Sequence, residues 1–123
     1  MEEAEWDLET AEYLHKGGRF NAACFYAQQS AEKAVKAVFQ KMHVDAWGHS
    51  VADLLGELSK THEVPKELMD SALELDKAYI SARYPNAHPS GSPRRRYIEE
   101  EARRFVEHAE KILRFCSDLL SKI

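Results

Sequence analysis

A cluster of helix-breaking residues between positions 85 and 93 interrupts a chain that is patterned for helices on both sides of it. The cluster contains Pro85, Pro89, Gly91 and Pro93. A proline inside a helix removes a backbone donor and clashes with the preceding turn, and it pushes the residue before it toward an extended conformation. We therefore expect one helix to end near Arg83, and a stiff loop to connect it to the next.

Apolar residues recur at three- and four-residue steps elsewhere, which is the pattern of amphipathic helices. The longest stripe begins at Ala23 and ends at Met42. Gly17 and Gly18 end the segment before it, and Ser50 is an N-cap candidate for a short helix. The predicted helices cover residues 2–16, 20–43, 50–60, 66–83 and 96–121.

Long helices with short connections predict an all-α fold, an up-and-down antiparallel four-helix bundle with an additional short helix. A chain of 123 residues is expected to form one domain over positions 1–123. No apolar run approaches the roughly 20 residues that span a bilayer. The start of the chain is acidic, unlike a secretory signal, so we expect a cytoplasmic protein without membrane contact.

The cysteines and glycines give no sign of a cofactor. Cys24 and Cys116 both fall on apolar helix faces, where buried, reduced thiols are expected. The chain has no cysteine and histidine spacing typical of zinc sites and no glycine-rich phosphate loop. We therefore expect neither a metal nor another cofactor.

Charge is distributed unevenly along the chain. Residues 83–104 contain six arginines and three glutamates, a net charge of +3, whereas the whole chain carries −4. The remainder therefore carries −7. A basic region on an acidic body can attract a polyanion or an acidic partner, although the same arginines could simply pair with Glu99, Glu100 and Glu101 on a solvated helix face.

Arg83 and His88 are the strongest candidates for chemistry. A guanidinium binds phosphate oxygens through a fixed fork of donors, and an imidazole exchanges protons near neutral pH. Alternatively, Arg83 is a cation that stabilises the last turn of a helix, and His88 is an ordinary loop histidine. Candidate substrate contacts and supporting residues are Tyr79, Tyr84, Asn86, Arg94, Arg95, Arg96, His49 and Asp76.

Three sequence segments together resemble one known family. They are residues 22–37 with the run Gln28-Gln29-Ser30-Ala31-Glu32-Lys33, then Gly48-His49-Ser50, and then Leu75-Asp76 followed by Tyr79 and Ala82-Arg83-Tyr84-Pro85. In this order and at these separations they resemble the HEPN domain, a helical nucleotide-binding family of prokaryotes and higher eukaryotes. The resemblance covers essentially the whole chain.

The resemblance implies a helical homodimer, often encoded beside a small nucleotidyltransferase with which it forms a toxin–antitoxin pair. It also implies a metal-independent endoribonuclease whose Arg, four to six residues and His motif is matched by Arg83 and His88. This chain differs at Tyr84, where active nucleases commonly have a polar residue, and at Pro85. The alternative is a non-catalytic helical dimer that binds a nucleotide or a minimal nucleotidyltransferase.

Overall fold

The computed structural model describes the backbone of residues 1–83 and 95–123, and the side chains of residues 1–78 and 98–123. The described part contains five helices and no strands: α1 (Glu2–Lys16), α2 (Phe20–Lys41), α3 (Val51–Leu58), α4 (Lys66–Arg83) and α5 (Arg95–Leu120). Each boundary lies within two residues of its prediction, and the all-α fold is confirmed. None of these helices is long and apolar enough to cross a membrane.

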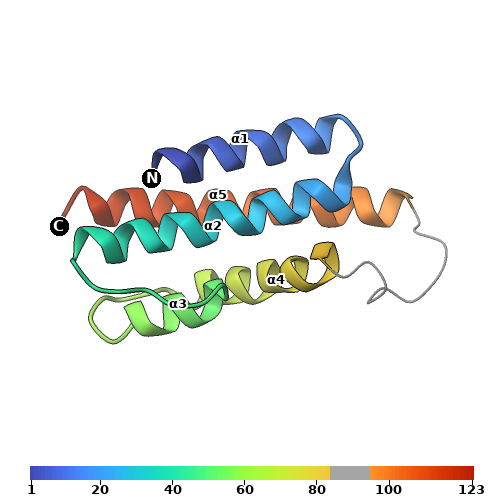
Figure 1. Cartoon of the computed structure of the whole chain (residues 1–123). Helices are drawn as coiled ribbons and strands as arrows, with labels where there is room; N and C mark the ends of the chain where they lie inside the picture. The colour runs from blue at the N-terminus through green and yellow to red at the C-terminus, as the bar shows by residue number, and fades with distance from the viewer. Residues whose placement is uncertain (84–94) are drawn as a thin grey trace.

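Helix α2 lies at the centre of the arrangement and contacts each of the other four helices. In Figure 1, α1 runs along one side of α2, and α4 with the short α3 lies on the other. Helix α5 overlaps α2 in this view and contacts α1, α2 and α4. Four long helices therefore form the bundle, and α3 is an added element between α2 and α4.

Small residues explain why α2 can occupy this position. Ala23, Ala27, Ala31 and Ala34 have no exposed surface, and alanine lets a neighbouring helix approach closely. The rest of the predicted stripe is buried as expected, except that Met42 is half-buried. A helix with buried residues on more than one side must have several neighbours, which is what the bundle provides.

Two of the connections begin with a tight helix end. At the end of α1, Gly18 has a φ of 80°, and the Arg19 amide donates to the Leu14 carbonyl at 2.8 Å. At the end of α2, His43 has a φ of 59°, and the Val44 amide donates to the Phe39 carbonyl at 3.0 Å. Both are Schellman motifs, and the second fixes the start of the α2–α3 connection.

Both cysteines are free and buried, as predicted. Removal from water destabilises the thiolate, so burial raises the pKa of Cys24 and the pKa of Cys116 each to about 12. Both groups are therefore protonated thiols at neutral pH and serve as packing residues.

Candidate active site

The structure describes only part of the predicted site. Tyr79 and Arg83 belong to the last turns of α4, while Arg95 and Arg96 begin α5; the side chains of these four lie outside the described part. The predictions for Tyr84, Asn86, His88 and Arg94 lie outside the described residues altogether. The roles assigned to Arg83 and His88 therefore stay predictions. The structure describes the neighbouring part of the predicted site.

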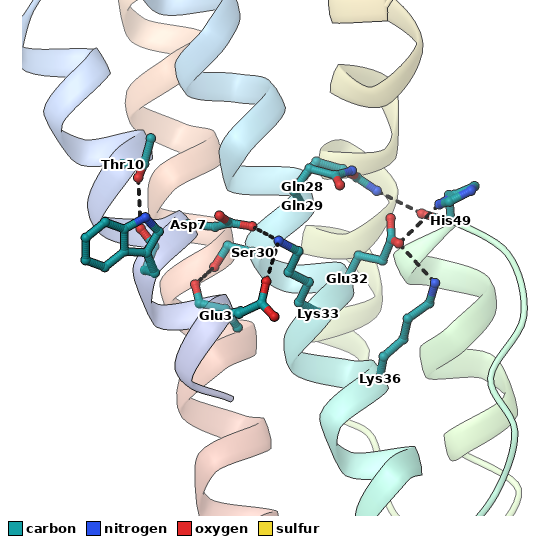
Figure 2. Close-up of polar contacts among 12 residues, drawn as sticks. Glu3, Asp7, Thr10, Gln28, Gln29, Ser30, Glu32, Lys33, Lys36 and His49 are labelled. Atoms are coloured by element: carbon teal, nitrogen blue, oxygen red, sulfur yellow. Dashed lines mark hydrogen bonds and ion pairs between the residues drawn. The ribbon is translucent and has the colours of Figure 1, made fainter.

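The described part of the site is a cluster of polar side chains where α2, the start of α3 and α4 meet. We call it the polar junction, formed by Gln28, Glu32, Lys36, His49, Ser50 and Asp76. At its centre is Glu32 of α2, which is 6% exposed. Its Oε2 lies 3.1 Å from Nδ1 of His49 and 3.0 Å from Nζ of Lys36, as Figure 2 shows.

Gln28 holds the backbone of the same histidine. The Gln28 side chain has no exposed surface, and its Nε2 donates to the His49 carbonyl at 2.8 Å. Its Oε1 in turn accepts a hydrogen bond from Nε2 of Gln29 at 2.7 Å. His49 is thus fixed through both its carbonyl and its ring (Figure 2), which is more than a histidine beside a helix cap requires.

Asp76 of α4 fixes the residues that follow His49. Its carboxylate accepts hydrogen bonds from Oγ of Ser50 at 2.8 Å, the Val51 amide at 2.8 Å and the Ala52 amide at 3.0 Å. A carboxylate at a helix N-terminus satisfies amides that have no partner within the helix and complements its dipole. The predicted N-cap is confirmed, because Oγ of Ser50 also accepts from the Asp53 amide at 3.0 Å.

The α4 helix connects the polar junction with Arg83. Asp76 and Arg83 both lie within α4, seven residues apart, so their backbone positions are on nearly the same side of the helix, about 10.5 Å apart along its axis. The described bonds of Asp76 all go to the start of α3, so its established role is to anchor that helix.

The chemistry available at the polar junction depends on the ring of His49. A carboxylate oxygen can only accept, so Nδ1 of His49 is the donor to Glu32. The His49 side chain is 61% exposed, whereas that of Glu32 is 7% exposed. A buried acceptor thereby orients an imidazole that solvent or a substrate can reach.

Glu32 and Lys36 were not among the predicted site residues, and Gln28 was named only within the segment that carries the family resemblance. A signal for all three was present, because positions 28, 32 and 36 are polar at four-residue steps along one helix. Such spacing places side chains one above the other on one face. Within the described part of the chain, no three acidic, histidine or cysteine side chains gather closely enough to hold a metal ion.

Comparison with known proteins agrees with this architecture. A HEPN domain protein from Thermotoga maritima is 59% identical and superimposes with a TM-score of 0.86, covering 100% of this chain and 98% of its own. TT1696 from Thermus thermophilus is 42% identical with a TM-score of 0.88, over 96% of this chain and 93% of its own. ST0689, described as an archaeal HEPN homologue, is 35% identical with a TM-score of 0.79, over 97% of this chain and 93% of its own.

A curated relative adds a name that bears on function. The protein called Putative toxin MJ1304, from Methanocaldococcus jannaschii, is 28% identical over 131 residues, which cover 99% of this chain and 86% of the relative. The HEPN domain family model matches residues 1–119. The resemblance noted from the three sequence segments is thus confirmed, and the chain belongs to the HEPN domain family.

Proposed function

We propose that this protein is a toxin-type HEPN protein that binds RNA beside the polar junction and cleaves it without a metal ion. The observation that carries the proposal is the oriented imidazole of His49, held 3.1 Å from the buried carboxylate of Glu32 on the side of the bundle where α4 leads to Arg83. A relative named as a toxin supports the biological role.

The proposed reaction uses the ribose 2′-hydroxyl as the nucleophile on the adjacent phosphorus. A base removes the hydroxyl proton, the P–O5′ bond breaks as the P–O2′ bond forms, and an acid protonates the leaving 5′-oxygen. Arg83 stabilises the charge that builds on the phosphate. The products are a 2′,3′-cyclic phosphate and a free 5′-hydroxyl.

Two proton-transfer groups are needed, because one histidine cannot act as base and acid in the same step. His88 fills one role. We assign the other to His49, whose ring is oriented through Nδ1 by Glu32 and whose side chain is 61% exposed. The two histidines of one chain then suffice for the chemistry, whereas a second copy would have to supply the other group if His49 were purely structural.

A cleavage assay with purified protein tests the proposal. Wild-type protein is expected to cut single-stranded RNA in EDTA and to leave cyclic phosphate ends, while Arg83→Ala and His88→Ala each lose cleavage by about a hundredfold or more. Circular dichroism and melting temperature serve as controls for the fold. Equal cleavage by wild type and both variants, or no cleavage of any RNA by the wild type, would overturn the nuclease function.

We also propose that the protein forms a homodimer and pairs with a small nucleotidyltransferase that neutralises it, with the arginine-rich residues 94–104 contributing to that contact. Exposed aromatic side chains support a protein contact, with Trp6 70% and Tyr13 78% exposed on α1. Light scattering at micromolar concentration tests the dimer. Co-purification with the product of a neighbouring nucleotidyltransferase gene tests the pairing, and failure of two folded proteins to associate would refute it.

A further inference from the structure

A second surface of the molecule, separate from the polar junction, is an open groove alongside α3. Its volume is about 860 Å³, and its walls come from the end of α2, the α2–α3 connection, α3 and α4. The apolar part of the wall includes Phe39, Val44, Trp47, Met69 and Leu73. We call this surface the α3 groove.

The α3 groove exposes large apolar side chains that the bundle does not use. Trp47 is 83% exposed, Leu73 is 55% exposed and Val44 is 48% exposed. Single exposed apolar residues are ordinary, but several around one concave surface indicate a site for a partner. Tryptophan in particular is enriched among the residues that contribute most to binding energy.

Gly56 gives independent support for an occupant. It lies inside α3 and lines the groove, although glycine in a helix interior is less stable than alanine by roughly 0.5–1 kcal/mol. A Cβ added at Gly56 would meet nothing within 4 Å. The bundle therefore does not need glycine at this position, whereas a partner that approaches the α3 backbone closely would.

The backbone around the α3 groove is already fixed. The Schellman motif at the end of α2 sets the position of Val44 through its 3.0 Å hydrogen bond to Phe39. At the other end, Asp76 anchors the first amides of α3. A preformed groove loses less conformational entropy when it binds a partner.

Charge decides what kind of partner fits. Asp45, Asp53 and Glu57 line the groove, and no lysine, arginine or histidine is among its lining residues in the described part of the chain. Glu57 lies 3.1 Å from Lys60 in an exposed pair, which contributes little. An apolar floor with an acidic rim is complementary to an apolar helix face flanked by lysine or arginine.

The chain's own exposed aromatic face does not match that description. Trp6 and Tyr13 on α1 lie among acidic residues, with Glu2, Glu3 and Glu5 in the first turn alone. Acids on a second copy would meet the acidic rim of the groove and repel it. The apolar stripe of α5 is already buried in the bundle.

From these features we infer that the α3 groove is the docking site for a basic amphipathic helix of a different protein. The apolar face of that helix lies on Trp47 and Leu73, its backbone passes close to Gly56, and its basic residues face Asp45, Asp53 and Glu57. This inference does not depend on RNA cleavage, and the experiment below measures binding alone.

The probe is a fluorescein-labelled peptide of about 18 residues with leucine at helical three- and four-residue steps and lysine between. Its control has glutamate in place of every lysine. Anisotropy is expected to show saturable binding of the basic peptide, at least about tenfold tighter than the acidic one. Trp47→Ala is expected to weaken binding of the basic peptide by about tenfold. Trp6→Ala, at a comparably exposed tryptophan, should leave that affinity unchanged.

Matched charge variants separate the groove from the overall charge of the protein. The groove variant combines Asp45→Asn, Asp53→Asn and Glu57→Gln, and the control combines Glu2→Gln, Glu5→Gln and Glu9→Gln. Both variants remove three negative charges. Only the groove variant is expected to lower the affinity for the basic peptide and to make that affinity less dependent on salt concentration. Gly56→Ala should keep or raise the melting temperature, because the added methyl group does not disturb the bundle. It should still lower the affinity for the peptide, because the methyl group fills space in the groove.

Four results would overturn the inference. They are no saturable binding of the basic peptide, equal binding of the acidic peptide, equal losses in the two charge variants, and unchanged binding in both Trp47→Ala and Gly56→Ala. Sedimentation provides a further check. If Trp47→Ala converted a wild-type dimer to monomer, the occupant would be a second copy of this chain and not a different protein.

Discussion

Helices α1 and α3 both pack on α2, but different interactions hold them there. Against α1, the contact is built largely from buried alanines such as Ala4 and Ala11. It also has a buried hydrogen bond from Oγ of Ser30 to the Ala4 carbonyl at 2.7 Å and an ion pair between Lys33 and the buried Asp7 at 2.8 Å. Against α3, the apolar face is joined by the polar junction, where Glu32 holds the ring of His49 (Figure 2). There Asp76 also fixes the first turn of α3.

The difference separates stability from geometry. Apolar burial is non-directional, so the alanine-rich contacts of the α1–α2–α5 half can be weakened while the arrangement is kept, and the Lys33–Asp7 pair there orients no residue of the polar junction. Hydrogen bonds to carboxylates are directional and strong, so the loss of one at the polar junction displaces the residues that it orients. A substitution in the first region should therefore change stability alone, whereas one in the second should change stability and activity together.

The largest effect is expected in the apolar half. Phe105 of α5 is 2% exposed, and Phe105→Ala should lower the free energy of unfolding by about 3–5 kcal/mol through lost burial and a cavity. Urea unfolding followed by circular dichroism measures the loss. RNA cleavage per folded molecule should stay near the wild-type rate. A lower cleavage rate under conditions where the variant is fully folded would contradict the proposed difference between the two regions.

A smaller stability effect with a larger functional effect is expected at Asp76. Asp76→Ala removes the acceptor of three hydrogen bonds at the start of α3 and should cost about 1–3 kcal/mol. Cleavage should fall further than the folded fraction does, because His49 precedes the released turn. Asp70→Ala is the control on the same helix, since its exposed pair with Lys66 contributes little.

The smallest effect is a pH dependence that belongs to the bundle and not to the site. His108 of α5 is bonded to Oγ of Ser71 at 2.9 Å, and burial, the largest contribution, lowers its pKa below the ordinary 6.5. As the pH falls, His108 therefore takes up its proton in the unfolded chain at a higher pH than in the folded chain. Stability contributed by the neutral ring is therefore present above pH 6.5 and is lost as the pH falls toward the lowered folded pKa.

His108→Gln tests that dependence. Melting temperatures at pH 7.5 and 5.5 should differ less in the variant than in the wild type, after the common effect of the carboxylates is subtracted. Cleavage by the folded variant should be unchanged. A pH dependence identical in the two proteins would show that His108 does not contribute.

The sequence predicted the helices well because helix formation follows local patterns. The stripe from Ala23 to Val38, the glycine end at Gly18 and the cap at Ser50 are each readable from neighbouring residues, and the structure confirms all of them. The polar junction was harder to predict. Glu32 and His49 are 17 residues apart, and Ser50 and Asp76 are 26 apart, so only the packing of α3 between α2 and α4 brings them together.

The partners of one predicted supporting residue were also not evident from the sequence. Asp76 lies on the same helix as Arg83, and its described bonds go to the start of α3. The helix N-terminus offers unpartnered amides, and these donors come from a segment that no local pattern connects with Asp76. For the α3 groove, the exposure of Trp47 and the open space at Gly56 could not be inferred before α3 was placed.

Chemical rescue of His49→Ala most directly tests whether the polar junction takes part in the reaction. The variant should lose about a hundredfold or more of the RNA cleavage rate while keeping the wild-type melting temperature. Added imidazole should restore part of that rate, because the ring of His49 is 61% exposed and a free imidazole can take its place. Asp76→Ala, whose defect is one of position, should gain nothing from imidazole. A His49→Ala protein that cleaves RNA at the wild-type rate, or one whose loss imidazole leaves unchanged, would contradict the account.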